Sequence, residues 1–355
     1  MRRHLVIAGA RPNFMKVAPI LAELSLRGTP ATLVHTGQHY DPAMSDVFFD
    51  ELGIPAPDHH LEVGSASHAV QTARIMEAFE PVVVAEKPDV VVVVGDVNST
   101  VACALVAAKL GVEVAHVEAG LRSRDWSMPE EVNRLVTDRL SQYLFAPSAD
   151  GVENLRAEGY PAASIHLVGN VMADTLLANL DRARARSTLA DLAVDPGGYA
   201  LLTLHRPSNV DDPGVLAGIL HAIGTIAARM PVVWPVHPRV RARLAASATP
   251  AGLRLIDPVG YLDAIALQAG AALVLTDSGG LQEETTILGV SCLTLRENTE
   301  RPITVEHGTN VVAGTDPVDI VRLAFEALDG APRPISRPPL WDGRTAERIV
   351  SVLSA

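Results

Sequence analysis

Two acidic residues follow short apolar runs, a position where side chains can do acid–base chemistry. Asp96 follows the run Val90–Val94, and Glu118 follows the run Val112–Val117. If these runs are neighbouring parallel strands, both carboxylates lie at the same edge of one sheet. Asp96 could instead cap a helix beginning near Asn98. Glu118 is harder to explain as a solvated loop residue, because apolar and small residues flank it. We therefore expect the two carboxylates to point into the same crevice, with Glu118 the stronger candidate for a functional role and Asp96 equally compatible with a cap.

A third carboxylate, Glu130, lies near the start of a predicted helix. Ser127 and Glu130 have the spacing of a capping box, and Pro129 suits a first helical turn, so the local pattern favours a structural role for Glu130. Arg134 and Asp138 follow at four-residue steps and could form a pair on one face of the same helix.

The second half of the chain places histidines and cations after two further apolar runs. His205 and Arg206 follow Leu201–Leu204, and His237 follows Val232–Val236. A single histidine is more often a buried structural group than a catalyst. Two pairs of a histidine with a cation at corresponding strand ends indicate an anion-binding site.

The segment from Asp277 to Glu284 follows another apolar run and opens a predicted helix. Ser278 can cap this helix, and Gly279 and Gly280 leave its first amides accessible to an anion such as a pyrophosphate. Glu284 could interact with the helix dipole or accept hydrogen bonds from sugar hydroxyls. Arg301, after the next run, could bring a cation to the same place.

The first strand-to-helix turn also carries cations. Gly9 permits a tight turn, and Arg11 and Lys16 lie near a predicted helix N-terminus, although an ordinary turn with surface cations fits equally well. The turn lacks the three-glycine dinucleotide fingerprint, so the sequence gives no support for NAD. No histidine or cysteine spacing typical of zinc occurs in the chain, and we expect no metal.

The elements that must position these residues are alternating strands and helices. Continuous apolar runs separated by helical stretches predict an α/β fold with two doubly wound parallel sheets facing a central cleft. We expect an N-terminal domain over residues 1–175 that also takes a C-terminal helix of about residues 342–355. A second domain covers residues 176–341, and the charged stretch Asp181–Arg186 is the expected hinge region.

Composition excludes several classes of protein. A chain of 355 residues with 48% hydrophobic and 20% charged residues is long and apolar enough for two folded domains. The net charge of −12 argues against binding to nucleic acid or anionic membranes. Two cysteines make no disulfide framework, the apolar runs are too short to cross a membrane, and the N-terminal residues lack the features of a signal peptide. We expect a cytoplasmic protein.

The order of these motifs resembles the non-hydrolysing UDP-N-acetylglucosamine 2-epimerases, which have the GT-B fold of two Rossmann-like domains. The resemblance covers nearly the whole chain. The matching segments are Gly9–Pro12, Gln38-His39, Gly95-Asp96, His116–Arg122, Pro129–Glu131, His205-Arg206, Pro235–His237, Asp277–Gly280 with Gln282–Glu284, and Thr299–Pro302.

The resemblance implies interconversion of UDP-GlcNAc and UDP-ManNAc without a redox cofactor or metal. In this family UDP is eliminated to leave 2-acetamidoglucal and then adds back. By this resemblance Asp96, Glu118, Glu130 and His205 are catalytic, which overrides the local interpretation of Glu130. The resemblance assigns binding of the UDP-sugar to Arg11, Lys16, His237, Ser278, Gly279, Gly280, Glu284 and Arg301. A homodimer and a place in polysaccharide or amino-sugar biosynthesis are also implied.

Departures from the family pattern leave alternatives open. Pro207–Asn209 replaces residues that help many bacterial members bind a second, activating UDP-GlcNAc, although the possible second-site residues Gln38, His39 and Arg206 remain. Asn13 replaces a common glutamate, and Val97–Thr100 replaces a threonine run. These changes could indicate another substrate, such as a UDP-2,3-diacetamido uronate. A GT-B glycosyltransferase, a hydrolysing epimerase and a non-catalytic nucleotide-sugar sensor are the other hypotheses.

Overall fold

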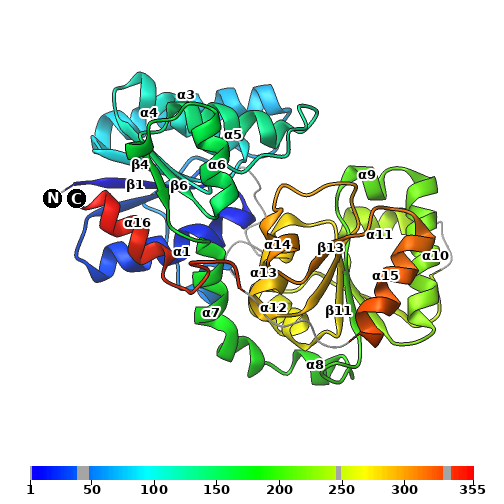
Figure 1. Cartoon of the computed structure of the whole chain (residues 1–355). Coiled ribbons are helices and arrows are strands. Elements are labelled where there is room, and N and C mark those ends of the chain that lie inside the picture. The colour runs from blue at the N-terminus through cyan, green and yellow to red at the C-terminus, as the bar shows by residue number, and fades with distance from the viewer. Residues whose placement is uncertain (1, 38–47, 245–248, 331–336) are drawn as a thin grey trace. The chain divides into compact units, whose positions relative to one another are not determined.

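The chain packs into two compact units. The computed structural model describes residues 2–37, 48–244, 249–330 and 337–355. Unit 1 comprises Met1–Ala178 and Pro339–Ala355, and unit 2 comprises Asn179–Pro338 (Figure 1). Each unit is built on one sheet in which every pair of neighbouring strands is parallel.

Unit 1 contains a seven-stranded sheet of order β3-β2-β1-β4-β5-β6-β7. Its strands are β1 (His4–Ala8), β2 (Ala31–His35), β3 (His59–His60), β4 (Val90–Val94), β5 (Glu113–Val117), β6 (Tyr143–Ala146) and β7 (Ile165–Leu167). Its helices are α1 (Arg11–Leu26), α3 (His68–Glu86), α4 (Asn98–Lys109), α5 (Pro129–Leu140), α6 (Ala149–Ala157), the 3₁₀ turn Ala162–Ser164, the first part of α7 (Val171–Arg184), and α16 (Thr345–Leu353).

The five consecutive valines of β4 are all buried, as expected for a central strand covered on both faces. Helices α3 and α4 pack together over one face of the sheet (Figure 1). On this face Ile75 and Phe79 of α3 belong to the same buried cluster as Val91 and Val93 of β4. Hydrophobic residues on alternate positions of the strand therefore reach opposite helical layers.

Unit 2 contains a six-stranded sheet of order β10-β9-β8-β11-β12-β13. Its strands are β8 (Ala200–Thr203), β9 (Val232–Pro235), β10 (Leu253–Ile256), β11 (Leu273–Thr276), β12 (Ser291–Thr294) and β13 (Asn310–Val312). Its helices are the end of α7, α8 (Thr188–Asp191), α9 (Pro207–Val210), α10 (Pro213–Ala227), α11 (Pro238–Leu244), α12 (Tyr261–Gly270), α13 (Gly279–Leu288), α14 (Ile303–Glu306) and α15 (Pro317–Asp329).

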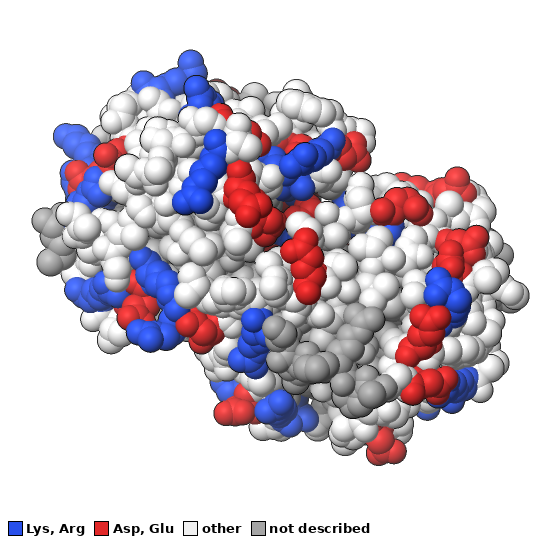
Figure 2. Space-filling view, in the orientation of Figure 1, with Lys and Arg blue, Asp and Glu red and all other residues white. Residues whose placement is uncertain are grey.

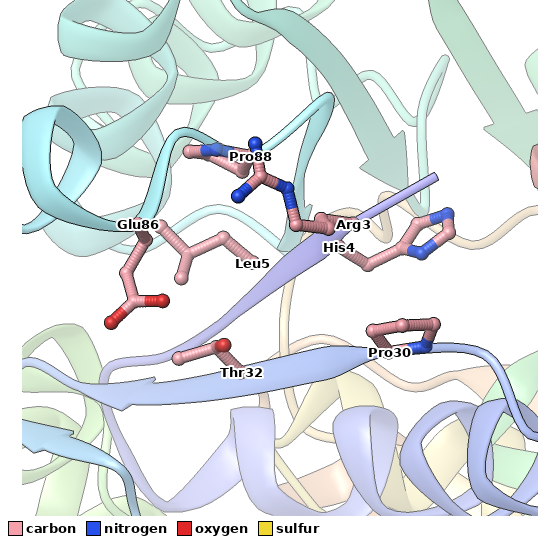
Figure 3. A pocket seen from close by; sticks show the side chains of 7 residues that line it. All are labelled: Arg3, His4, Leu5, Pro30, Thr32, Glu86 and Pro88. Atoms are coloured by element: carbon pink, nitrogen blue, oxygen red, sulfur yellow. The ribbon is translucent and has the colours of Figure 1, made fainter. Parts of the chain in front are cut away.

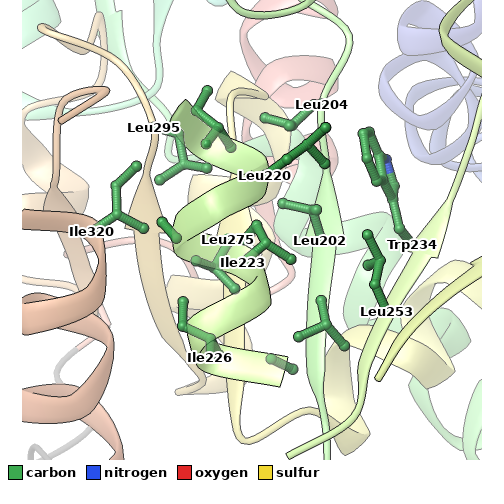
Figure 4. Packing of buried hydrophobic residues seen from close by; sticks show 14 of the residues in the cluster. Leu202, Leu204, Leu220, Ile223, Ile226, Trp234, Leu253, Leu275, Leu295 and Ile320 are labelled. Carbon is green, nitrogen blue, oxygen red and sulfur yellow. The ribbon is translucent and has the colours of Figure 1, made fainter. Parts of the chain in front are cut away.

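Alternate residues of the unit 2 strands supply two separate cores. Leu202 and Trp234 pack with Ile223 of α10 and Ile320 of α15 on one face (Figure 4). The intervening residues, such as Leu201, belong to a second cluster with α8 and α12. Both faces of the sheet are therefore covered by helices. A ligand can then approach the sheet only at the ends of its strands.

The C-terminal helix α16 belongs to unit 1, where it packs against α1. The Asp174 carboxylate of α7 accepts hydrogen bonds from the amides of Thr345 (3.1 Å) and Ala346 (2.7 Å) at the start of α16. Arg27, just after α1, donates to the carbonyl of Glu347 at 3.1 Å. The last residues of the chain thus complete the fold of its first half.

The prediction of two doubly wound parallel α/β sheets is confirmed, with differences in detail. Strands β3, β7 and β13 have only two or three residues, so they leave no hydrophobic pattern that the sequence could reveal. The stretch Asp181–Arg186, expected as a hinge, largely continues helix α7 to Arg184. Its alternating charges suit a solvated helix as well as a linker.

Candidate functional site

Both sheets place their polar candidates at a topological switch point. In unit 1 the chain runs outward from β1 to β2 and β3 and then returns to β4 beside β1. In unit 2 it runs from β8 to β9 and β10 and returns to β11 beside β8. The connections leaving the carboxyl ends of such adjacent strands go in opposite directions, and ligands bind in the crevice that this opens.

Asp96 follows β4 at the unit 1 switch point and is held by helix α5. Its Oδ2 lies 2.7 Å from one terminal nitrogen of Arg134 and accepts a 3.0 Å hydrogen bond from Arg134 Nε. Asn133 donates to the Asp96 carbonyl at 2.9 Å. Asp96 does not cap α4, whose N-cap residue is Val97. An ion-paired carboxylate that keeps about a quarter of its side chain exposed remains accessible to a ligand.

Glu118 follows the adjacent strand β5 and is almost fully buried. Its Oε2 forms an ion pair with Lys16 Nζ, and its Oε1 has no hydrogen-bond partner among the described residues. The residue adopts φ = +75°, a strained conformation for a side chain other than glycine. The amides of Glu118 and Ala119 both donate to the Phe145 carbonyl at 3.1 Å, which fixes this turn.

Glu118 lies close to Gly95, the residue before Asp96. A Cβ atom placed on Gly95 would lie 2.9 Å from Lys16 Nζ and 3.5 Å from Glu118 Oε2, so the residue before Asp96 borders the Lys16–Glu118 pair. Gly95 therefore has no room for a side chain. The sequence predicted two carboxylates at one sheet edge, and the geometry places them there.

A buried network supports the loop that carries Glu118. The His116 ring contacts Asp138 Oδ1 at 2.6 Å through Nδ1 and the Gly95 carbonyl at 2.8 Å through Nε2. Asp138 Oδ2 lies 2.7 Å from Arg122 and accepts from the Gly120 amide at 3.1 Å. Burial alone would raise the pKa of Asp138, but His116 and Arg122 outweigh it and lower the pKa.

Glu130 and Glu131 have different environments despite being adjacent. Glu131 is buried, forms a 2.7 Å ion pair with Arg134 and accepts from the amides of Ser123 and Arg124. Glu130 has no hydrogen-bond or ion-pair partner among the described residues and is half-buried. It lies one turn before Asn133 and Arg134, on the helix face that reaches Asp96.

The capping box expected for α5 is not formed. The helix begins at Pro129 after the N-cap residue Met128, and the Ser127 hydroxyl donates to Asp125 at 2.6 Å. Arg134 and Asp138, which were expected to pair with each other, pair with different residues instead. Arg134 reaches Asp96 and Glu131, whereas Asp138 reaches His116 and Arg122.

The first turn of unit 1 is fixed by Asn13. Its Oδ1 accepts from the amides of Gly9 (3.1 Å) and Ala10 (3.0 Å), and its Nδ2 donates to the Val94 carbonyl at 3.1 Å. Asn13 therefore ties the β1–α1 turn to the end of β4. Arg11 begins α1, but its side chain lies outside the described part of the structure, as do Gln38 and His39 entirely.

His205 follows β8 in unit 2 and contacts a buried aspartate that the sequence analysis did not assign to the site. His205 Nδ1 lies 2.8 Å from Asp277 Oδ1, and the Asp277 carboxylate also accepts from the amides of His205 and Arg206. Burial raises the pKa of Asp277, but the hydrogen bonds from His205 and the Arg206 amide outweigh it and lower the pKa. The position of Asp277 directly after a strand was the signal that could have identified it.

The N-terminus of helix α13 borders a cluster of charges. Ser278 is its N-cap residue but makes no side-chain cap hydrogen bond, and Gly279 and Gly280 form the first turn. A Cβ on Gly279 would lie 2.6 Å from an Arg301 guanidinium nitrogen. Arg301 in turn pairs with Glu283 at 2.8 Å and Glu300 at 2.9 Å.

Glu284 is buried deeper in α13. Its Oε2 accepts from Gln268 Nε2 at 2.7 Å. Burial raises the pKa of Glu284 to about 7, and hydrogen bonds from Gln268 and Tyr261 oppose that shift. A dipole-stabilising surface role therefore does not describe Glu284. His237, predicted to bind the nucleotide, follows β9 and is exposed.

Other features of the molecule lie apart from this site. A small pocket lined by Arg3, His4, Leu5, Pro30, Thr32, Glu86 and Pro88 opens beside the start of β1, at the opposite sheet edge from Asp96 (Figure 3). Within the described ranges, no group of three or more His, Cys, Asp or Glu residues could hold a metal ion.

None of the described helices is long and apolar enough to cross a membrane. On the face drawn in Figure 2, basic and acidic side chains are interspersed.

Two doubly wound parallel domains in one chain define a protein of the GT-B type. The family model described as UDP-N-acetylglucosamine 2-epimerase matches residues 24–354. The chain belongs to the UDP-N-acetylglucosamine 2-epimerase family, as the sequence resemblance predicted.

Individual relatives of two substrate types are similar to this chain at nearly the same sequence identity. A UDP-N-acetylglucosamine 2-epimerase of Methanocaldococcus jannaschii is 42% identical over 361 residues, covering 98% of each chain. A UDP-2,3-diacetamido-2,3-dideoxy-D-glucuronate 2-epimerase of Pseudomonas aeruginosa is 43% identical over 328 residues, covering 91% of this chain and 92% of that one. The crystal structure of the M. jannaschii UDP-GlcNAc 2-epimerase in complex with UDP-GlcNAc and UDP has a TM-score of 0.91, with 41% identity and 99% coverage of both chains.

Proposed function

We propose that this chain is a non-hydrolysing 2-epimerase that interconverts UDP-GlcNAc and UDP-ManNAc. The observation that carries the proposal is the pair of ion-paired carboxylates, Asp96 and Glu118, at the switch point of unit 1. Membership of the family supports the same reaction, as does the similarity to a structure that contains UDP-GlcNAc and UDP.

The chemistry requires acid–base groups and a stabilised leaving group. No carbonyl lies next to C2 of the sugar, so removal of its proton must accompany departure of UDP from C1. A base takes the C2 proton, the C1–O bond breaks with its electrons going to UDP, and 2-acetamidoglucal remains. UDP then adds back to C1 as C2 is protonated on the opposite face. Neither a nicotinamide nor a metal is needed for this sequence.

We assign Asp96, Glu118 and Glu130 to the sugar as base, acid and stabiliser of the positive charge that develops near C1. Asp96 is ion-paired with Arg134, and Glu118 is ion-paired with Lys16. Glu130 has no ion-pair partner among the described residues, so its carboxyl group is not committed to a contact within the protein. Lys16, expected to bind substrate, acts through Glu118 in this arrangement.

We assign UDP to unit 2. The free amides at the start of α13 and the guanidinium of Arg301 favour the pyrophosphate, with Ser278, Gly279 and Gly280 beside it. Arg11 is a further phosphate ligand in the proposal, on the basis of the family resemblance. His205 assists at the pyrophosphate or the sugar, Glu284 accepts from ribose hydroxyls, and His237 lines the nucleotide site.

The test is an NMR time course with UDP-GlcNAc in D₂O. The proposal predicts signals of UDP-ManNAc, deuterium at C2 of both sugars, and no accumulation of UDP. Accumulating UDP with free ManNAc would identify a hydrolysing enzyme. Tight binding without exchange at C2 would identify a sensor, and turnover that requires an acceptor would identify a glycosyltransferase. Each of these three results contradicts the proposal.

A UDP-2,3-diacetamido uronate is the second candidate substrate. Its basis is the relative from P. aeruginosa, whose 43% identity is as high as that of the UDP-GlcNAc 2-epimerase from M. jannaschii. Comparing kcat/KM for the two UDP-sugars under the same conditions separates the candidates. A larger value for the uronate would replace UDP-GlcNAc as the substrate.

We further propose a cytoplasmic homodimer that supplies polysaccharide or amino-sugar biosynthesis. Unit 1 exposes apolar side chains on neighbouring helices, including Val70, Val132 and Val136, together with Trp126. A second copy of the chain would cover them. Light scattering should give twice the chain mass of 37.6 kDa, and a single-chain mass would contradict the dimer.

Regulation by a second UDP-GlcNAc is a separate question. Arg206, one candidate for such a site, forms a 3.3 Å ion pair with Glu300 and donates through Nε to the Asp277 carbonyl at 3.1 Å. A sigmoidal dependence of rate on UDP-GlcNAc concentration would indicate activation. We include no activating site in the proposed function.

A further inference from the structure

A buried carboxylate lies behind the exposed histidine of unit 2. Asp277 is fully buried, whereas more than half of the His205 side chain is exposed. Asp277 Oδ1 lies 2.8 Å from Nδ1 of the His205 ring. The other ring nitrogen, Nε2, does not contact Asp277. A carboxylate that accepts from Nδ1–H fixes the imidazole in the tautomer whose Nε2 carries the lone pair.

The other contacts of Asp277 hold its carboxylate in place. Its Oδ2 accepts from the Arg206 amide at 2.9 Å and from Asn209 Nδ2 at 3.3 Å, and Asn209 also donates to the Leu295 carbonyl at 2.9 Å. The carboxylate is thus fixed by groups that follow β8 and β12. Its lowered pKa agrees with an ionised acceptor.

The charged neighbour Arg206 does not compete for the same oxygen. Its Nε donates to the backbone carbonyl of Asp277, and its guanidinium is directed to Glu300. The negative charge of Asp277 is therefore available to the imidazole. We propose that Asp277 is a positioning residue that fixes His205 in the Nδ1–H tautomer and presents Nε2 to the substrate.

This inference rests on the proposed function for the identity of the substrate but not for the tautomer. Nitrogen-15 NMR of the ring should show protonated Nδ1 and unprotonated Nε2 for neutral His205 in the wild-type protein. In Asp277→Asn the side-chain amide can donate to Nδ1, so the proton should move to Nε2. Unchanged ring signals in a folded Asp277→Asn protein would overturn the proposal.

Asn209→Ala is the control for a purely structural effect. It removes a support of Asp277 and loosens the same loop, but it leaves the contact between Asp277 and Nδ1 intact. We expect this variant to keep the wild-type tautomer. A loss of the Nδ1–H tautomer in Asn209→Ala would show that loop order, rather than the Asp277 carboxylate, controls the ring.

A double-mutant cycle tests the consequence for activity. Asp277→Asn should lower kcat by about 10²–10⁴-fold, as expected when a catalytic histidine is held in the wrong tautomer, and should change KM much less. When His205→Asn is already present, adding Asp277→Asn should lower kcat almost no further. Additive losses would contradict action through His205. If His205→Asn alone has wild-type activity, the catalytic role proposed for His205 fails, while the NMR result still stands.

Discussion

The acidic residues of the candidate site differ in what lies within hydrogen-bonding distance of them. Glu131 is fixed by Arg134 and two amides, whereas its neighbour Glu130 has no such partner among the described residues. Glu118 combines a buried ion pair, an unpartnered oxygen and a left-handed backbone. Unsatisfied and strained groups of this kind cost stability and are usually retained for function.

Amide substitutions of the two ion-paired carboxylates should abolish most of the activity. We expect Asp96→Asn and Glu118→Gln each to lower kcat by about 10²–10⁴-fold, because each removes acid–base chemistry while leaving UDP binding nearly unchanged. Epimerisation measured by NMR and UDP affinity measured by calorimetry provide the two readouts.

The control for these substitutions is Glu153→Gln, since Glu153 is exposed on α6 and should be replaceable. Circular dichroism should confirm that each variant is folded. Glu118→Gln should also unfold at a lower temperature, because it leaves Lys16 buried without its counter-charge. Turnover near the wild-type rate in both Asp96→Asn and Glu118→Gln would defeat the assignment.

Glu284 should make stability depend on pH. Its pKa is about 7 in the folded protein, above the ordinary value of 4.5. Between these values the folded state holds a proton that the unfolded state has lost, so this group lowers the free energy of unfolding as pH rises from about 4.5 to 7. The full shift corresponds to about 3 kcal/mol.

Glu284→Gln should therefore be more stable than the wild type at pH 8 and similar to it at pH 4.5, as measured by urea unfolding. The same variant should lose affinity for UDP if the carboxylate binds ribose. An equal stability difference at both pH values would contradict the raised pKa.

At the level of elements, the switch point of each unit explains why residues distant in sequence lie together within that unit. Parallel pairing of β4 with β5 brings Asp96 and Glu118 together, and pairing of β8 with β11 brings His205 and Asp277 together. The helix N-terminus that follows β11 adds unpaired amides to the same region. Asp96, Glu118, His205 and Asp277 therefore each lie directly after the end of a strand or one residue beyond it.

The first turn of α13 offers a matched pair of glycines. Gly279→Ala should destabilise the protein by about 1–3 kcal/mol and weaken UDP binding, because the new Cβ would displace the Arg301 guanidinium. Gly280→Ala has its nearest neighbour at 3.9 Å and should be neutral or slightly stabilising. Urea unfolding and UDP titration provide the comparison. Equal stability of the two variants would show that the approach of Arg301 to Gly279 is unimportant.

At the level of the whole molecule, the C-terminus stabilises the unit that contains the N-terminus. Residues 339–355 pack with unit 1 although unit 2 separates them in sequence. Asp174 fixes the start of α16, and Leu353 is fully buried near its end. Loss of this helix should therefore affect unit 1 more than unit 2.

Leu353→Ala tests this arrangement. We expect the free energy of unfolding to fall by about 2–4 kcal/mol, which is the usual effect of truncating a buried leucine. Hydrogen exchange should increase in α1 and α16 and stay unchanged in α10 and α15. The control, Val318→Ala, truncates a side chain that is 75% exposed and should change stability by less than about 0.5 kcal/mol. Faster exchange in α10 and α15 would argue against the assignment of α16 to unit 1.

The sequence by itself determined the fold class, the family and the order of the motifs. Short β-branched runs such as Val90–Val94 that alternate with helical stretches are typical of a parallel sheet covered by helices, and this pattern is local. The polar residues that follow such runs lie at the carboxyl ends of strands for the same reason. The sequence pattern therefore predicted that Asp96, Glu118 and His205 follow strands, whereas their catalytic roles stay predictions.

Only the tertiary structure decided the partners of these residues. Lys16 is separated from Glu118 by 102 positions, and His205 from Asp277 by 72, so no local pattern links them. The same holds for Arg134, whose choice of Asp96 over the nearby Asp138 depends on how α5 packs against α4 and β5. Charge state and tautomer follow from such contacts, because electrostatic interactions depend on distance in space rather than along the chain.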